Sequence, residues 1–150
     1  VKNTNIHVQT RGNCEFVDIT DKVAQKVEQS GISNGTVTIF VAGSTAGLTT
    51  IEFEPGVLAD LKRSLSILAP ADIPYAHDGK WGDGNGRSHV KAAIVGPSLT
   101  IPVGKGLLDC GTWQQVVLLE LDTRPSRHRT ITCTIIGEQG PHKPEKGPRR

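Results

Sequence analysis

The chain lacks the features that would tie it to a membrane or to a disulfide framework. No apolar run among its 150 residues approaches the ~20 residues of a membrane-spanning helix. Its only cysteines are Cys14, Cys110 and Cys133, an odd number without a C-x-x-C pair. We therefore expect no disulfide framework and no membrane partner, and the composition favours a reducing, cytoplasmic location.

The chain also lacks an excess of one charge over most of its length. Residues 1–137 carry 13 basic and 13 acidic side chains, and the formal net charge of +2 arises entirely in residues 138–150. A balanced body argues against a duplex nucleic-acid partner or a charged membrane surface. We expect one folded domain over residues 1–138 and a disordered basic tail over residues 139–150.

Residues that favour strands are abundant instead. Val, Ile and Thr make up 39 of the 150 residues, and these β-branched types suit a pleated, half-buried surface. Apolar and turn patterns predict strands over 5–10, 36–41, 89–95, 98–103, 114–121 and 130–136. Successive strands are expected to form two hairpins, 89–103 and 114–136. Helical spacing predicts two helices, over 19–30 and 55–68, so the fold class is α+β with mainly antiparallel sheets.

Residues 70–88 have no periodic pattern, yet they hold two of the six aromatic residues and four glycines. A long loop of this kind inside a domain is usually functional. His77 and Asp78 lie in it, and His89 opens the strand predicted next. A loop that folds back would bring both imidazoles to one metal ion, with a carboxylate or water completing the shell. The alternative is a loop histidine held only by hydrogen bonds.

Basic and hydroxyl side chains offer contacts for an anion. Ser44 and Thr45 lie in a run of small residues after a strand, which either cradles a phosphate or only connects two strands. Arg87 and Lys91 flank His89, and strand alternation would place Lys91 on the same face as His89. The two cations either hold an anionic substrate or are solvated surface charges.

A third group follows from strand alternation. Thr112 and Gln114 are expected on one strand face, where they could orient a substrate, with Trp113 opposite. Trp113 either packs in the core or walls a pocket. Glu52 alternates with apolar neighbours and therefore points into solvent or into a site.

Six motifs occur in an order that resembles the YjbQ-like family, whose members are described as secondary thiamine-phosphate synthases. The motifs are Gly43-Ser-Thr-Ala-Gly-Leu-Thr49 with Glu52, His77-Asp78, Ser88-His-Val-Lys91, Gly96-Pro-Ser-Leu99 with Ile101-Pro-Val103, Gly111-Thr-Trp-Gln114, and Ile136-Gly-Glu138. The resemblance covers about residues 1–138. It implies a β-sandwich that assembles as a homotrimer, with a metal site near the subunit contacts.

Taken together, the residue patterns and the resemblance suggest roles for individual residues. The metal ligands would be His77, His89 and Asp78; the catalytic residues would be Glu52, Lys91 and Gln114; the substrate contacts would be Ser44, Thr45, Arg87, Lys91, Thr112 and Trp113. Many family members carry a histidine where this chain has Gly43. Without that third imidazole, Asp78, Asp83, Glu52, water or a neighbouring subunit must complete the shell of a divalent ion such as Zn²⁺ or Mg²⁺.

The activity implied is the joining of a thiazole phosphate to a pyrimidine pyrophosphate, or a related metal-assisted reaction on a phosphorylated small molecule. The alternative from another class is a non-catalytic trimeric protein that binds a metal or a small anion.

Overall fold

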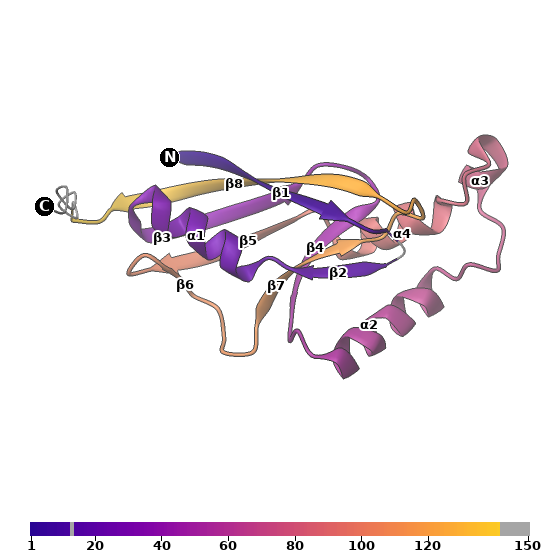
Figure 1. Ribbon diagram of the computed structural model, residues 1–150, viewed down its shortest axis with the longest axis horizontal. Helices are drawn as coiled ribbons and strands as arrows, with labels where there is room; N and C mark the ends of the chain where they lie inside the picture. Colours follow the sequence, from indigo (N-terminus) through magenta and orange to yellow (C-terminus); the bar gives the residue numbers. More distant parts are fainter. Residues whose placement is uncertain (13, 142–150) are drawn as a thin grey trace, which may run out of the picture.

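The computed structural model describes residues 1–12 and 14–141, which form two antiparallel sheets and four helices (Figure 1). The elements in chain order are β1 (Lys2–Thr10), β2 (Glu15–Asp18), α1 (Thr20–Ser30), β3 (Ile32–Val41), β4 (Ala46–Ile51), α2 (Pro55–Leu68), α3 (Ala76–Trp81), α4 (Gly86–Val95), β5 (Ser98–Gly104), β6 (Leu107–Leu108), β7 (Gln115–Glu120) and β8 (Arg127–Gln139). The predicted α+β class is confirmed.

The two sheets have different sizes and are joined through their buried faces. The larger sheet has the order β1-β8-β3-β5-β6, and the smaller has the order β2-β7-β4. Strand β7, the central strand of the smaller sheet, is buried on both faces because a separate apolar core packs against each face. Val116 and Leu118 belong to the main core with the larger sheet and α1, whereas Val117 and Leu119 pack in a second core with α2 and α4. Alternation along one strand thus links the two cores.

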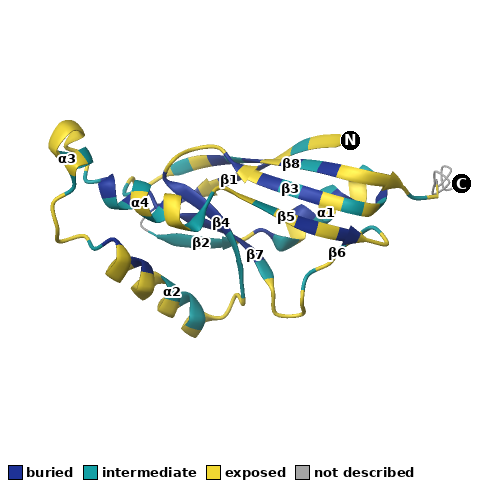
Figure 2. Cartoon of the chain, turned by 180° about the vertical axis from the view of Figure 1, so that it is seen from behind, coloured by how far each residue is buried: buried dark blue, intermediate teal, exposed yellow. Residues whose placement is uncertain are grey.

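Helices α2 and α3 are the least buried of the four helices. Figure 2 shows buried positions concentrated in the strands, while both helices are mostly exposed. Leu65 is the only fully buried side chain of α2, and α3 has none. In the described ranges 1–12 and 14–141, no helix is both long and apolar enough to cross a membrane.

The predicted strand 89–95 is wrong, because this segment forms most of helix α4. Ser88 and Ala92 are buried four residues apart, which is the spacing of a helix face, and Gly96 follows the last turn with a φ of 92°. A run of seven residues is too short for local periodicity to separate a strand from a helix. The hairpin expected over 89–103 is therefore absent from the described structure. Helix α3 also replaces part of the loop expected over 70–88.

The second predicted hairpin is also wrong, because its strands lie in different sheets. Strand β7 pairs with β2 and β4, while β8 pairs with β1 and β3. The polar connection between them carries the chain from one sheet to the other instead of turning it back. Strand β8 extends to Gln139, and residues 142–150 of the predicted tail lie outside the described part of the chain.

Candidate functional site

Helices α3 and α4 are held together by a short network that begins at Asp78. Its Oδ1 accepts a hydrogen bond of 2.8 Å from the backbone N–H of Gly86, the first residue of α4. Tyr75, just before α3, donates its hydroxyl to the carbonyl of Pro70 at 2.7 Å. A Cβ at Gly86 would lie 2.6 Å from the Cβ of Tyr75, so the close approach of the two segments requires glycine there.

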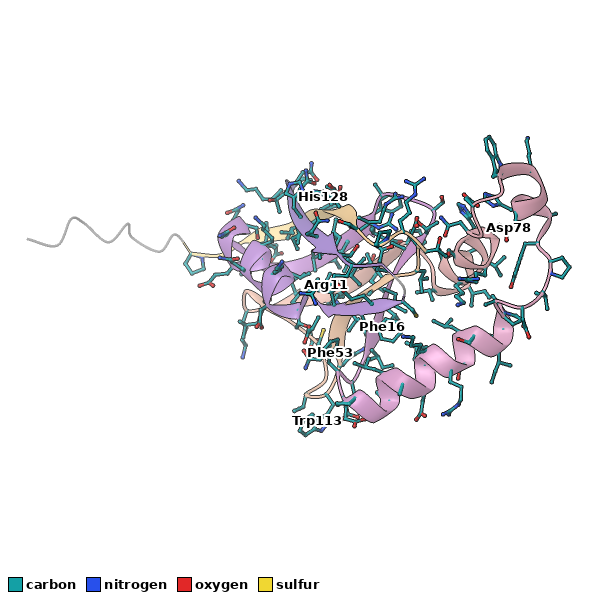
Figure 3. The ribbon with its side chains drawn as sticks, turned by 45° about the vertical axis from the view of Figure 1, so that its right-hand side comes forward. Arg11, Phe16, Phe53, Asp78, Trp113 and His128 are labelled. Atoms are coloured by element: carbon teal, nitrogen blue, oxygen red, sulfur yellow. The ribbon has the colours of Figure 1, made fainter. Side chains whose placement is uncertain are left out.

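Four side chains gather at this junction, which we call the α3–α4 site (His77, Asp78, Asp83 and His89). The Nδ1 of His77 lies 3.3 Å from Oδ1 of Asp78 and 3.5 Å from Oδ1 of Asp83. Ligand atoms of these three residues all lie within 4.8 Å of one another. The ring of His89 stands beside them, with its centroid 4.5 Å from that of His77. The residues predicted as metal ligands are therefore neighbours, and Asp83 adds a second carboxylate (Figure 3 labels Asp78).

A buried asparagine, which the sequence interpretation did not assign, anchors this site to the body. Asn85 is 5% exposed, and its Oδ1 accepts hydrogen bonds from the backbone N–H and the hydroxyl of Thr123 at 3.1 and 3.2 Å. Its own N–H donates to Oδ1 of Asp83. The signal in the sequence was a polar residue between two glycines, Gly84-Asn85-Gly86, which is typical of backbone held close to other groups.

Helix α4 separates the predicted cations from the histidines. Arg87 and Lys91 are four residues apart and share one helix face, whereas His89 is two residues from each and about 200° away. The expectation that Lys91 and His89 share a face is wrong because it assumed a strand. Partial burial lowers the pKa of Lys91, an effect opposed by Cys14 and reinforced by the charges of Arg87 and Lys62. Lys62, on α2, thus joins a group of three cations.

The predicted phosphate-binding hydroxyls differ in their surroundings. Ser44 is exposed, whereas Thr45 is 4% exposed and donates its hydroxyl to Asp122 at 2.8 Å. The same oxygen accepts a hydrogen bond from Nη2 of Arg129 at 2.8 Å. For Thr45 to bind substrate, as predicted, its hydroxyl must give up its buried hydrogen bonds with Asp122 and Arg129. Ser44 needs no such change.

Arg129 belongs to a buried charge network that was not predicted. It pairs with Glu120 through Nε and Nη2, and both side chains are at most 2% exposed. Burial alone would raise the pKa of Glu120, but hydrogen bonds from Arg129 and Thr10 outweigh it, so the pKa lies below its usual value. A Cβ at Gly43, whose φ is 124°, would lie 2.8 Å from Nη1 of Arg129. The guanidinium therefore leaves little room for a side chain at position 43.

The remaining predicted residues are grouped around Trp113, which lies at the opposite end of α2 from Asp78 (Figure 3). A hollow of about 460 Å³ is lined by Glu52, Trp113 and neighbouring acidic residues. Trp113 is 72% exposed and precedes β7, so the strand alternation expected for Thr112 and Gln114 is wrong. Gln114 donates its amide to the hydroxyl of Thr50 at 3.1 Å. Within one chain, these residues do not meet the α3–α4 site.

Comparisons with known proteins agree over nearly the whole chain. The family model described as "UPF0047 protein YjbQ-like" matches residues 4–138. A UPF0047 protein of Methanothermobacter thermautotrophicus is 36% identical over 131 residues, covering 87% of this chain and 89% of that protein. YugU of Bacillus subtilis is 32% identical over 132 residues, covering 87% and 94%.

Solved structures give the same result. A YbjQ-like protein of unknown function from Sulfolobus solfataricus has a TM-score of 0.79 and 37% identity, covering 91% of this chain and 99% of that one. A hypothetical protein from Aeropyrum pernix has a TM-score of 0.84 and 30% identity, covering 92% and 100%. The span 4–138 includes every group of residues described above.

Proposed function

The chain belongs to the UPF0047 protein YjbQ-like family, and from that premise we propose that it performs a metal-assisted reaction on a phosphorylated small molecule. The observation that carries the proposal is the approach of the donor atoms of His77, Asp78 and Asp83 to within 4.8 Å, with the His89 ring beside them. Mixed imidazole and carboxylate donors suit Zn²⁺ better than Mg²⁺, which prefers oxygen. A divalent ion held there would stabilise charge on a phosphate or a leaving pyrophosphate.

The cations on the other face of α4 support an anionic substrate. Partial burial is the main cause of the lowered pKa of Lys91, and the charges of Arg87 and Lys62 lower it further, so the charged form of Lys91 is disfavoured there. A bound phosphate would stabilise that charged form. Ser44 and Thr45 remain candidates for a second phosphate contact.

The named reaction that we propose is thiamine-phosphate synthesis. The thiazole nitrogen would form a bond to the pyrimidine methylene carbon, the bond from that carbon to oxygen would break, and pyrophosphate would leave. Glu52, Lys91 and Gln114 are the proposed catalytic residues, and Thr112 and Trp113 the proposed substrate contacts. In a homotrimer, a second copy would bring the hollow beside Trp113 to the α3–α4 site. The 72% exposure of Trp113 supports this arrangement, because a partner would cover it.

A non-catalytic protein that binds a metal or a small anion is the second candidate. It is favoured by the separation within one chain of Asp78 from Trp113, which lines the hollow together with the proposed catalytic Glu52 (Figure 3). Under this alternative, the α3–α4 site binds its ion but no bond of a ligand changes.

Metal content tests the site directly. The purified full chain is supplied with Zn²⁺. We expect replacement of His77 or His89 by alanine to remove one equivalent of bound Zn²⁺ per chain. Lys80→Ala, an exposed change on the same α3 helix, should retain the metal and serves as the control. Equal metal content in all four proteins would contradict the proposal.

Activity separates the two candidates. The protein is incubated with thiazole phosphate and pyrimidine pyrophosphate, and the product is identified by its mass. We expect thiamine phosphate from the wild type and none from His77→Ala. Absence of product at every metal supplied would remove the synthase assignment, and a metal site that survives this result would favour the binding protein.

A further inference from the structure

Four of the five histidines in the chain come together as two pairs, and only one pair lies in the α3–α4 site. The other pair joins His7 of β1 to His128 of β8, with Nδ1 of His7 3.2 Å from Nε2 of His128. We propose that His7 and His128 form a second, independent site for a borderline divalent metal ion such as Zn²⁺, Ni²⁺ or Cu²⁺. Figure 3 labels His128 above the sheet, well away from Asp78.

The distance between the two nitrogens suits a shared ion. Imidazole nitrogens bind Zn²⁺ at about 2.0–2.1 Å, so two of them 3.2 Å apart enclose an angle of about 100° at the metal. That angle lies between octahedral and tetrahedral geometry. The rings are inclined by 43° with centroids 5.3 Å apart, so their edges converge and their faces do not stack. An ion could enter between the nitrogens without a change of backbone.

The sheet fixes this geometry in advance. Strands β1 and β8 pair without a register shift from Lys2 to Thr10, with His7 opposite Thr130 and Gln9 opposite His128. His7 and His128 are therefore diagonal neighbours on one face of adjacent strands. The hydroxyl of Thr130 lies 3.4 Å from Nδ1 of His7, where it could hold a water bound to the ion. Both histidines are exposed, so water can supply the remaining ligands.

The two arginines that flank His128 in the sequence do not oppose binding. Arg127 and Arg129 flank His128 in the sequence, and strand alternation turns both away from its face. Arg129 is paired with Glu120, and Arg127 with Asp122 at 3.2 Å. In the hydrogen bond between the facing nitrogens, one imidazole donates its N–H and the other accepts with its lone pair, so the donor ring must move its proton to its other nitrogen before both can bind an ion. A metal ion would take the place of the shared proton.

The test is a titration of the purified full chain with Zn²⁺, followed by calorimetry and by NMR of the histidine side chains. We expect wild type and His77→Ala to share a site that His7→Ala and His128→Ala each weaken at least ten-fold. The loss of an outer hydrogen-bond partner already costs about 10–100-fold in such sites. The affinity for Zn²⁺ is measured both with His77 present and in His77→Ala, so the result does not depend on the outcome at the α3–α4 site.

Three controls keep the result interpretable. Asn5→Ala removes an exposed side chain from the same face of β1 and should leave binding unchanged. His142→Ala, which lies outside the described residues, should do the same. His7→Gln, which keeps a polar side chain, should weaken binding as His7→Ala does. Unchanged affinity in the His7 and His128 variants, or no binding by the wild type at millimolar Zn²⁺, would overturn the proposal.

Discussion

Among single residues, Arg129 and Glu120 form the most deeply buried ion pair in the described part of the chain. Arg129 comes from β8 in the larger sheet and Glu120 from β7 in the smaller one, so the pair joins the two sheets. Thr10 donates to Glu120 at 2.7 Å, and Thr45 accepts from Arg129. Buried charges persist only where such partners replace water. The pair therefore depends on every member of the network.

Glu120→Gln should lower the free energy of unfolding at pH 7 by about 3–5 kcal/mol, because it leaves the charge of Arg129 buried without compensation. The folded pKa of Glu120 lies below the ordinary 4.5, so its contribution is full above that value and is lost as the pH falls through the folded pKa. The difference between variant and wild type should accordingly shrink in acid.

Urea denaturation between pH 7 and pH 3 measures this difference. Glu138→Gln, an exposed carboxylate on β8, is the matched control and should change stability little. A difference for Glu120→Gln that stays below 1 kcal/mol, or that does not change with pH, would speak against a compensated charge pair.

Among the elements, α4 shows the limit of predicting secondary structure from local sequence. The segment His89–Val95 has β-branched residues at both ends and alanines between them, so it fits a strand or a helix equally well. Its helical state depends on contacts that the segment does not contain, such as Val95 against Gly47 of β4. Whether the segment is a strand or a helix decides whether Lys91 and His89 lie on the same face or on different faces. The motif resemblance is enough to predict that His77 and His89 are neighbours. The position of Lys91 on the other side of α4 follows only from the fold.

The buried network was beyond prediction for a related reason. Arg129 lies in a segment of alternating basic residues, where nothing local distinguishes the one that points inward. Its partner Glu120 ends an apolar strand that lies in another sheet, whereas the sequence pattern predicts a hairpin of those two strands. The charge pair could be found only after the sheets were assigned.

The contact between α3 and α4 should be sensitive to one methyl group. In Gly86→Ala the new Cβ would lie 2.6 Å from Cβ of Tyr75 and 3.1 Å from Oδ1 of Asp78, so α3 must move. We expect a loss of about 1–3 kcal/mol in stability and weaker metal binding by His77 and Asp78. Zn²⁺ titration and thermal unfolding give the two readouts.

Gly79→Ala is the matched control for this substitution. Gly79 lies in α3 with open space around its Cβ position, so alanine should leave metal binding intact and, if anything, stabilise the helix. Should Gly86→Ala bind Zn²⁺ as tightly as Gly79→Ala does, the α3–α4 contact would not position the ligands.

At the scale of the whole molecule, α2 lies to one side of the two sheets (Figure 1), and large apolar side chains are exposed near its C-terminal end. Ile67 and Leu68 are 72% and 63% exposed, and Trp113 is equally open at the other end of the helix. Apolar side chains gathered along one side of a protein are typical of contacts with another chain. Association of identical copies would cover them and bring separate groups of candidate residues together.

We therefore predict that the protein forms the homotrimer implied by the family resemblance. Light scattering should give a mass three times the 16.0 kDa of one chain. Ile67→Glu should shift the protein to a monomer, because a charge in an apolar contact is costly to bury. Leu107→Glu, at a residue 69% exposed on β6 and far from α2 in Figure 1, should stay trimeric. A monomeric wild type, or a trimer unaffected by Ile67→Glu, would contradict an interface along α2, and the candidate site would then have to work within one chain.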